Sequence, residues 1–355
     1  MSVSRTIPKL RSLGYDEYSK SLQNSFEVDD LDFTEGSSTE LSSDECDHEL
    51  QPYNHHWRIV RNVLRWSPFV QTYKKVKYPW IQLAGHQGNF ISGTAGTILK
   101  KSCGEEEKCF QKLVGDPLSE FVPKFRGKTI SNGEEFLELE DLLSKFDCPS
   151  VMDVKIGLRT YLEDELIKAR EKPKLRKDMF EKMIAVDPDE PNEEERRLKA
   201  VTKPRYMVWR ETISSTATLG FRIDGIKFKD GTTSRDFKTT KTETDVIKSI
   251  QKFTENRHLI IVKYLERLKI LKQTLIKSQF FQTHEIIGSS LLFVHDLNKA
   301  DIWMIDFAKT YPVPKNLTIT HLNEWMIGNH EDGYLIGIDN LIKIFTVLEA
   351  LTIKL

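Results

Sequence analysis

PSVMDVKIGLRTY, residues 149–161, is the stretch of this sequence that decides the fold. Its apolar run carries Asp153 and Lys155, and Gly157 and Arg159 follow. Because side chains of a strand alternate between its two faces, residues 153 and 155 should project from the same side. An acid and a base held in this way can contact a hydroxyl group and a phosphate together. A structural ion pair at the edge of a sheet is the alternative, and the stretch alone does not exclude it.

Length and composition predict a globular protein. The chain has 355 residues, of which 39% are apolar, enough for two lobes or for one domain with a large insertion. No run approaches the ~18 apolar residues of a membrane span, and the N-terminus has no signal-peptide pattern. We therefore expect no stable membrane insertion. The cysteines show no C-x-x-C spacing, which favours reduced thiols in the cytoplasm (Cys46, Cys103, Cys109, Cys148).

Charge is distributed unevenly along the chain. Residues 1–50 hold 12 acids and 4 bases, whereas the whole chain has a net charge of −1, so the remainder is basic by about +7. The acidic segment is rich in Ser and lacks helical periodicity, and we predict that it is disordered. The basic remainder suits an anionic ligand.

The region from residue 79 to 143 has the pattern of a small β-rich lobe. Thr97–Lys100 reads as a strand, Glu105–Val114 as a helix, and Leu137–Leu143 as a strand that runs into a connector. Charged short helices follow at 163–204, where prolines interrupt the pattern. Further strands are expected at 218–226, 236–240, 289–294 and 302–307, and helices at 245–282 and 339–355.

Candidates for the chemistry of phosphoryl transfer occur in both halves of the chain. That chemistry needs a lysine on the donor phosphates, acids on a metal ion and a group that orients the attacking hydroxyl. Lys100 ends an apolar strand, and Asp306 ends another; an acid there needs a partner such as a metal ion. The turn Gly85–Gly88 can cover phosphates with its backbone N–H groups. A solvated lysine, a turn-initiating aspartate and a plain hairpin turn are the alternatives.

Four motifs in order carry a resemblance to a known family. PSVMDVKIGLRTYLEDEL has the P-x-x-x-D-x-K-x-G signature of the inositol phosphate kinases, and IGSSLLFVHD (287–296), MIDFAKT (304–310) and EDGYLIGIDNL (331–341) agree with it. The segments WSPFVQTYKKVKYPWIQLAGHQGNF, KPKLRKDMFEKM, VTKPRYMVWRE and TLGFRIDGIK resemble the trisphosphate 3-kinase branch. The resemblance covers roughly residues 55–355.

The resemblance implies an α+β fold, two-lobed and kinase-like, with a helical inositol-binding insertion. The catalytic domain would span 79–355, with an N-lobe at 79–143, the insertion at 163–204 and a C-lobe in the remainder. The implied reaction is ATP- and Mg²⁺-dependent phosphorylation of the 3-hydroxyl of inositol 1,4,5-trisphosphate to the 1,3,4,5-tetrakisphosphate, which shapes calcium signalling. A broader inositol polyphosphate multikinase and an inactive calmodulin-binding scaffold are the alternatives. Nucleic acid is not an expected partner, because the basic residues are not interleaved with aromatic residues that could stack on nucleobases.

The resemblance also implies roles for individual residues. Asp153 would orient or deprotonate the attacking hydroxyl, and Lys155 would contact the transferred phosphoryl group or an inositol phosphate. The nucleotide and metal sites would use Lys100 on the ATP phosphates, Asp153 between the nucleotide and the inositol, main-chain groups of Glu140 and Leu142 on adenine, and Asp306 with Ser290 on Mg²⁺. The substrate would be held by Lys155, Arg176, Lys203, Tyr206, Arg210 and Lys227.

Two features bear on selectivity and on the metal segment. The helical insertion of about forty residues (163–204) lies between the D-x-K motif and Tyr206, and relatives of broad specificity have a shorter segment there, so the insertion favours a selective pocket. The family has Gly after I-D-F where this chain has Ala308. We expect activity to survive, with a penalty if the backbone there needs a positive φ.

Residues 51–78 form a basic segment before the catalytic domain. From 55 to 77 it holds bases without acids, with Trp57 and Trp66 near helical spacing, and Pro68 should end the helix. The segment resembles the calmodulin-binding region of the same branch, and a basic amphipathic helix with two tryptophan anchors suits that partner. Packing of both tryptophans on the kinase body is the alternative; attraction to a membrane surface is weaker.

Overall fold

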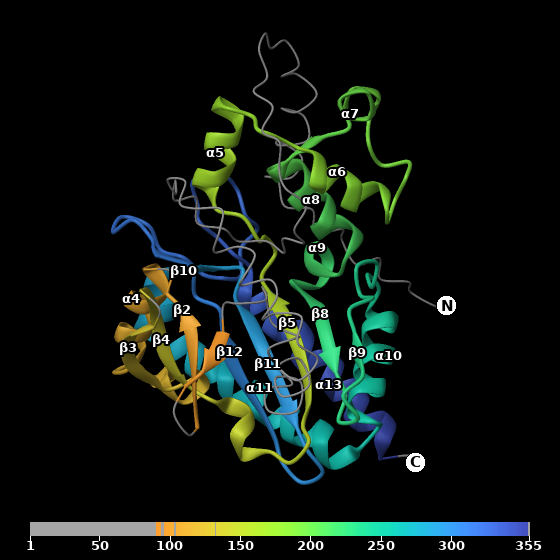
Figure 1. Cartoon of the computed structure of the whole chain (residues 1–355). Coiled ribbons are helices and arrows are strands. Elements are labelled where there is room, and N and C mark those ends of the chain that lie inside the picture. The colour runs from red at the N-terminus through yellow and green to blue at the C-terminus, as the bar shows by residue number, and fades with distance from the viewer. Residues whose placement is uncertain (1–89, 94–95, 103, 132, 354–355) are drawn as a thin grey trace.

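The structure, a computed structural model, describes residues 90–93, 96–102, 104–131 and 133–353. Its strands form a small four-stranded sheet, a large five-stranded sheet and two two-stranded pairs, with helices around them (Figure 1). The fold is α+β, two-lobed and kinase-like, as predicted. The expected disordered segment 1–50, the basic segment 51–78 and the turn Gly85–Gly88 lie outside the described residues. Within those residues, no helix combines the length and the apolar character needed to cross a membrane.

The small sheet has four antiparallel strands in the order β1-β2-β4-β3. The strands are β1 (Phe90–Ser92), β2 (Thr97–Lys101), β3 (Phe125–Ser131) and β4 (Glu134–Glu140). Helix α4 (Glu105–Leu113) packs beside it, with three acids in its first turn and Lys112 in its last, which suits the helix dipole. The predicted strand at 97–100 and helix at 105–114 are confirmed. Short 3₁₀ turns follow at η2 (Pro117–Phe121) and η3 (Leu142–Lys145).

The large sheet has five strands in the order β12-β11-β5-β8-β9, and all neighbours are antiparallel. They are β5 (Ser150–Ile156), β8 (Phe221–Lys227), β9 (Thr233–Ser234), β11 (Ser290–His295) and β12 (Ala300–Ile305). The strand predicted at 236–240 is wrong, because the chain turns there: the N–H of Thr240 donates to the carbonyl of Phe237. The strand expected from residue 218 begins three residues later, since Thr216–Leu219 is the short helix α9.

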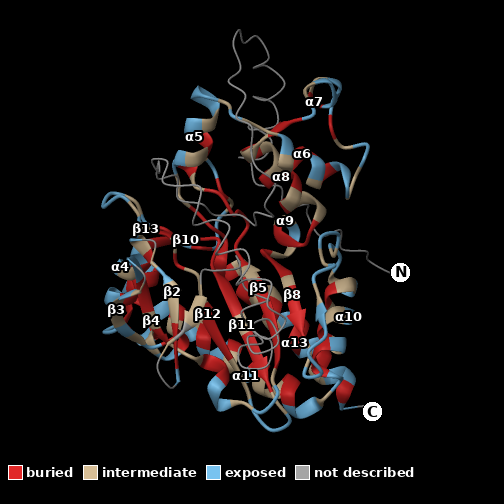
Figure 2. Cartoon of the chain, viewed as in Figure 1, coloured by how far each residue is buried: buried red, intermediate tan, exposed pale blue. Residues whose placement is uncertain are grey.

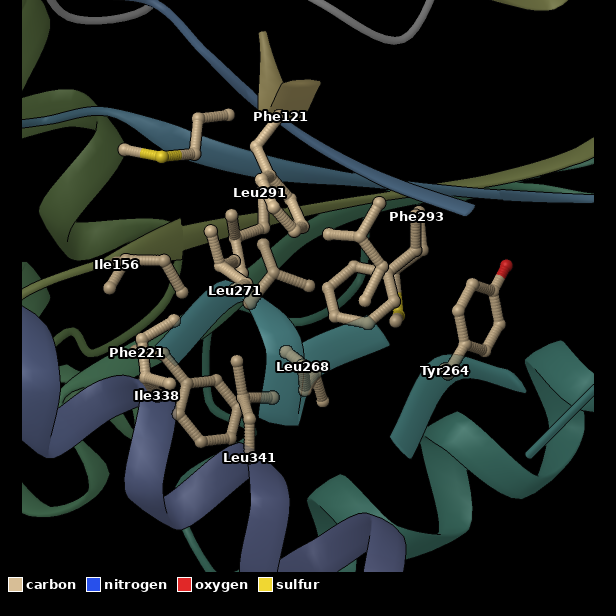
Figure 3. Packing of buried hydrophobic residues seen from close by; sticks show 14 of the residues in the cluster. Phe121, Ile156, Phe221, Tyr264, Leu268, Leu271, Leu291, Phe293, Ile338 and Leu341 are labelled. Atoms are coloured by element: carbon tan, nitrogen blue, oxygen red, sulfur yellow. The ribbon is translucent and has the colours of Figure 1, made fainter. Parts of the chain in front are cut away.

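One face of the large sheet is the hydrophobic core. Met152, Val154 and Ile156 are fully buried there, against helices α11 (His258–Lys277) and α13 (Tyr334–Thr352). Figure 3 shows Ile156 among core residues of α11 and α13, and Figure 2 shows buried residues along β5, β8 and β11. Each buried aliphatic side chain contributes about 1.5–3 kcal/mol. The alternation of the strand then leaves the opposite face of β5 for Asp153 and Lys155.

The remaining helices cover the core or build a separate group. Helices α10 (Glu243–Thr254) and α12 (Gln279–Thr283) flank α11, and β10 (His284–Ile287) pairs with β13 (Lys309–Pro312). Beyond the ends of β5 and β8 lies a helical group (Figure 1). It contains α5 (Glu163–Glu171), β6 (Leu175–Arg176), α6 (Lys177–Ile184), α7 (Glu193–Leu198), β7 (Val201–Thr202), α8 (Lys203–Ile213) and α9. The boundary predicted at residue 204 therefore falls in the first turn of α8.

Gly157 explains the glycine of the signature. Its φ is +109°, and a Cβ there would lie 3.1 Å from the carbonyl oxygen of Asp332. Its N–H donates to the carbonyl of Gly220 at 2.8 Å. Only glycine combines this φ with this close approach, so the turn leaves β5 directly towards the helical group.

Candidate active site

A cleft lies between the two sheets. Its lining includes strand residues of the small sheet, the connector 140–143 and strand residues of the large sheet, and its volume, open to solvent, is about 670 Å³. Most of the wall is apolar, formed by residues such as Ile98, Leu139, Val151 and Leu292. The polar residues are few: Lys100, Glu106, Glu140, Asp141, Asp153 and Asp306.

Lys100 joins the two sheets electrostatically. Its Nζ lies 2.7 Å from Oε1 of Glu106 on α4 and 2.6 Å from Oδ1 of Asp306 after β12. The side chain is only 15% exposed, which excludes the alternative of a solvated strand-end lysine. Burial by itself would lower the pKa of Lys100, but Asp306 and Glu106 together raise it above the ordinary value. The ammonium is therefore a permanent charge inside the cleft.

Glu106 is a residue that sequence reasoning missed. Its side chain is fully buried, and Oε1 also accepts the backbone N–H of Phe307 at 3.0 Å. It stands in the middle of a run of three glutamates, 105–107, and nothing in that run marks which one faces inwards. The only signal was its place six residues after Lys100, within the first turn of the predicted helix.

Asp306 adopts a left-handed backbone conformation, with φ of +64°. The penalty that was expected at Ala308 does not arise, because Ala308 is not among the described residues with positive φ. The strain lies instead at the acid, and Asp tolerates this conformation better than most residues. Burial raises the pKa of Asp306, but the charges of Lys100 and Lys155 lower it by more. The net pKa lies below the ordinary value, so the carboxylate is ionised.

Asp153 and Lys155 project from the cleft face of β5, the central strand of the sheet. The central position excludes the alternative of an ion pair at a sheet edge. Asp153 is 7% exposed, and its Oδ1 has no hydrogen-bond partner. Burial and then the charge of Asp224 raise the pKa of Asp153 to about 7, although Lys155 opposes the shift. A carboxyl group with a pKa near neutrality is suited to accept a proton from a hydroxyl.

Oxygen atoms near Asp306 fit a hard divalent cation. The sheet register places Ser290 opposite Lys155 on one side and Ile305 on the other, so Ser290 lies in the same row as the residue before Asp306. The Ser290 Oγ and the Asp153 Oδ1 are buried with no regular hydrogen-bond partner, and Ser290 lies close enough to Asp153 to lower the pKa of that carboxyl. Within the described ranges, no three His, Cys, Asp or Glu side chains are grouped to hold a metal by themselves. This donor set suits Mg²⁺, which takes one or two carboxylates together with substrate phosphates and water.

The connector after β4 lines the apolar end of the cleft. Glu140 and Leu142, the predicted adenine contacts, are both in the lining. The Glu140 carboxylate points to Lys145, 2.5 Å away, which leaves main-chain groups as the means of contact with a base. The fully or largely buried neighbours Val151 and Trp303 pack behind this end of the cleft.

Helix α8 turns a polar face towards the end of β5. Lys203, Tyr206 and Arg210 are spaced three and four residues apart, so they share one side of the helix. Burial lowers the pKa of Arg210, and the nearby charge of Arg222 lowers it further. The Nη1 atom of Arg210 is buried without a hydrogen-bond partner. An unpaired guanidinium group beside a second one indicates a place for an anion.

The other predicted substrate residues are distributed around this face. Arg176 binds Asp178 through two nitrogens, at 2.9 and 3.0 Å, and the charge of Asp178 reaches Tyr206. Lys203 contacts Glu165 at 3.2 Å.

Lys227 is not brought into this group. It lies at the other end of β8, opposite Val151 and near Cys148. It shares the cleft face of the sheet, but the structure shows no contact between it and α8.

Two further residues of the site were also missed. Arg222 pairs with Lys155 across the sheet, and its Nε donates to Asp224 at 2.8 Å. Asp224 also lies 3.9 Å from the Lys155 Nζ. Both belong to the segment TLGFRIDGIK, where alternation of apolar and charged residues was the only available signal.

The structure has two lobes, and Lys100 of the small lobe binds one acid from each lobe, Glu106 and Asp306. This arrangement defines a protein of the kinase-like class. A family model described as inositol polyphosphate kinase matches residues 136–346. The chain belongs to this family. It is 56% identical to the inositol-trisphosphate 3-kinase B of Homo sapiens over 291 residues, which are 82% of this chain and 31% of that protein. It is 51% identical to the Homo sapiens 3-kinase A over 295 residues, 82% of this chain and 64% of that protein.

A more distant relative is the inositol polyphosphate multikinase of Schizosaccharomyces pombe. It is 24% identical over 309 residues, which are 77% of this chain and 98% of that protein. The chain thus spans between about one third and two thirds of the length of the two 3-kinases.

Proposed function

We propose that this protein transfers the terminal phosphoryl group of ATP to the 3-hydroxyl of inositol 1,4,5-trisphosphate and so forms the 1,3,4,5-tetrakisphosphate. One observation carries the proposal. Asp153 lines the cleft between the two lobes, and Lys155 on the same face of β5 lies 3.9 Å from Asp224, whose charge also interacts with Arg210 of α8. A donor phosphate and a polyanionic acceptor can therefore meet at these two residues.

The proposed roles follow from the contacts. Lys100, held by Glu106, binds the donor phosphates. Asp306, with Ser290 and the free oxygen of Asp153, holds Mg²⁺, which would neutralise charge on the phosphates. Asp153 takes the proton of the attacking hydroxyl, and Lys155 stabilises the transferred group. The connector at Glu140 and Leu142 contacts adenine.

On the acceptor side, Lys203, Tyr206 and Arg210 contact the phosphates from α8, and Arg176 binds Asp178, whose charge reaches Tyr206. Lys227 remains a proposed contact whose support is the family motif rather than proximity to this group. The names of the relatives at 51–56% identity favour the 3-kinase over the multikinase, since the multikinase of Schizosaccharomyces pombe is 24% identical. A narrow acceptor preference also agrees with a helical group that covers the end of the sheet.

A substrate panel tests the proposal. The full chain is incubated with ATP and Mg²⁺ and with inositol phosphates of different phosphate patterns, and the products are separated by anion-exchange chromatography. We expect turnover of inositol 1,4,5-trisphosphate at its 3-position and little turnover of the others. Equal use of many acceptors would identify a multikinase, and no turnover with intact ATP binding would identify a scaffold.

Asp153→Asn should abolish turnover and leave the fold intact. Asp301→Asn is a matched control, because Asp301 lies on the neighbouring part of the same sheet but pairs with Arg267 outside the cleft. Full activity of the Asp153 variant would remove this residue from the mechanism.

We also propose regulation by calcium–calmodulin through residues 55–77, with Trp57 and Trp66 as anchors. The support is the sequence pattern of that segment. Replacement of both tryptophans by alanine should abolish binding to calcium-loaded calmodulin in calorimetry without change in the acceptor KM. A cytoplasmic location is also proposed, because the four cysteines of the sequence show no C-x-x-C spacing, which agrees with a reducing compartment.

A further inference from the structure

Beneath the polar face of α8 lies a buried group of charges. Lys155, Arg210 and Arg222 meet around the ionised carboxylate of Asp224, and Glu211 and Asp153 also act on Arg222. The Arg222 Nε is 2.8 Å from Asp224 Oδ1, and the Lys155 Nζ is 3.9 Å from Asp224 Oδ2. Burial raises the pKa of Asp224, but Arg222, Lys155 and Arg210 lower it to about 2. Asp224 is therefore an anion at every physiological pH.

These acids leave a donor of the three cations unsatisfied. The Arg222 guanidinium uses its Nε on Asp224 and its Nη1 on Thr216 Oγ1, at 3.3 Å. The Arg210 Nη1 is buried with no acceptor. Leaving a charged donor buried and unpaired is costly, and two guanidinium groups side by side repel one another. An anion with several oxygens would remove both penalties.

The local backbone directs Asp224 to this position. It is the extra residue of a bulge in β8, since Ile223 is opposite Val154 and Gly225 is opposite Asp153. Bulges occur next to active sites, where they change the direction of a side chain. Asp224 thus reaches Arg222 on its own strand and Lys155 on the next strand at the same time.

We propose that Arg222 is a further phosphate-binding residue of the acceptor site, acting as a pair with Arg210, and that Asp224 is the positioning residue that holds Arg222 and Lys155 in place. The ligand is a phosphate group of the acceptor, and the inference rests on the proposed function. A planar guanidinium group binds two phosphate oxygens at once, which a lysine cannot do in the same geometry.

Calorimetric titration of the full chain with inositol 1,4,5-trisphosphate, without nucleotide, tests the arginine. Arg222→Met should raise Kd by ~10- to 100-fold, the effect of losing a charge-assisted contact. Arg222→Lys keeps the charge and should still raise Kd by ~5- to 10-fold, and it serves if the methionine variant does not fold. Arg205→Met is the matched control: Arg205 lies on α8 and pairs with Glu195 and Glu190, and its variant should bind within about twofold of wild type.

The Asp224→Asn variant distinguishes two roles of the carboxylate: positioning the cations, or competing with the phosphate for them. It increases the positive charge of the site by one. If the carboxylate merely competes with the phosphate, binding tightens; if it positions the cations, binding weakens, and Asp224→Glu restores most of the affinity. We expect weakening by about tenfold with a KM for ATP that changes less than twofold.

The outcomes are distinct. Wild-type affinity in Arg222→Lys overturns the role of the arginine, and tighter binding in Asp224→Asn overturns the role of the acid, although the proposed function survives either result. A wild-type chain that binds ATP but no inositol phosphate overturns the proposed function and this inference together.

Discussion

The substitution Glu106→Gln removes the negative charge with which the small lobe binds Lys100. The wild-type carboxylate is fully buried, contacts the Lys100 Nζ at 2.7 Å and accepts the N–H of Phe307 at 3.0 Å. The amide can still accept from that N–H, so the change acts mainly on Lys100. The lysine then has Asp306 as its one remaining carboxylate partner among these contacts, at 2.6 Å.

The expected loss follows from the strength of one charge-assisted hydrogen bond, about 1.5–3 kcal/mol. Because 1.4 kcal/mol is a factor of ten, kcat/KM for ATP should fall by ~10- to 150-fold. A second effect has the same direction. Lys100 would bind Asp306 more exclusively, so the concentration of Mg²⁺ needed for half-maximal rate should rise.

Initial rates at varied ATP and varied Mg²⁺ measure both effects, and circular dichroism checks the fold. Glu107→Gln is the control, since Glu107 is the next residue of α4 and also pairs with a lysine, Lys128, at 3.0 Å outside the cleft. If Glu106→Gln and Glu107→Gln have the same ATP and Mg²⁺ dependence, the contact between Glu106 and Lys100 has no role in binding the donor.

Three other predictions concern the acceptor site and the fold. Arg210→Ala should raise KM for the inositol by ~10- to 100-fold and KM for ATP by less than twofold, and unchanged inositol kinetics would refute the assignment. His321 donates from Nδ1 to Asp332 and from Nε2 to the carbonyl of Phe281, so the ring is doubly protonated; burial lowers its pKa, but Asp332 raises it above 6.5 overall. Its stabilisation is complete below pH 6.5 and is lost as pH rises through the raised pKa. Urea titrations from pH 6 to 9 should therefore show that the wild type loses stability relative to the His321→Gln variant as pH rises. The loss should be about 1.4 kcal/mol for each pH unit that separates the pKa of His321 in the folded state from its pKa in the unfolded state. A difference in free energy of unfolding that stays constant across this range contradicts the charge assignment. Gly157→Ala should lower the free energy of unfolding by about 1–3 kcal/mol in the same assay, because its φ is +109°, and an unchanged value would show that the turn can relax.

Several features of the fold were accessible from the sequence because they are local. Alternation in PSVMDVKI placed Asp153 and Lys155 on one face of a strand, and the register of β5 with β11 and β8 has them there. Apolar periodicity located α4 and α13, although α13 begins at Tyr334, five residues before the predicted start. The strand predicted at 236–240 was wrong, because the composition of that loop is typical of a strand while its backbone turns.

Residues whose role depends on distant partners were not accessible in this way. Glu106 and Phe307 are 201 positions apart, and Lys100 and Asp306 are 206 apart. Nothing local distinguishes Glu106 from Glu105 or Glu107, since only packing of α4 against the segment after β12 buries one of them. In the same way, Asp224 became part of the site through a bulge that its sequence does not announce.

Sequence alone determined the residues that can do the chemistry: an acid and a lysine two apart on a strand, an acid after another strand, and a lysine at the end of a third. These follow from the period of a strand and from the cost of burying a charge without a partner. The tertiary structure decided which charges meet, because a Coulomb interaction depends on distance in space and on burial. Lys100 was joined to Glu106 and Asp306, Asp224 was placed among three cations, and Lys227 was left at the far end of its strand.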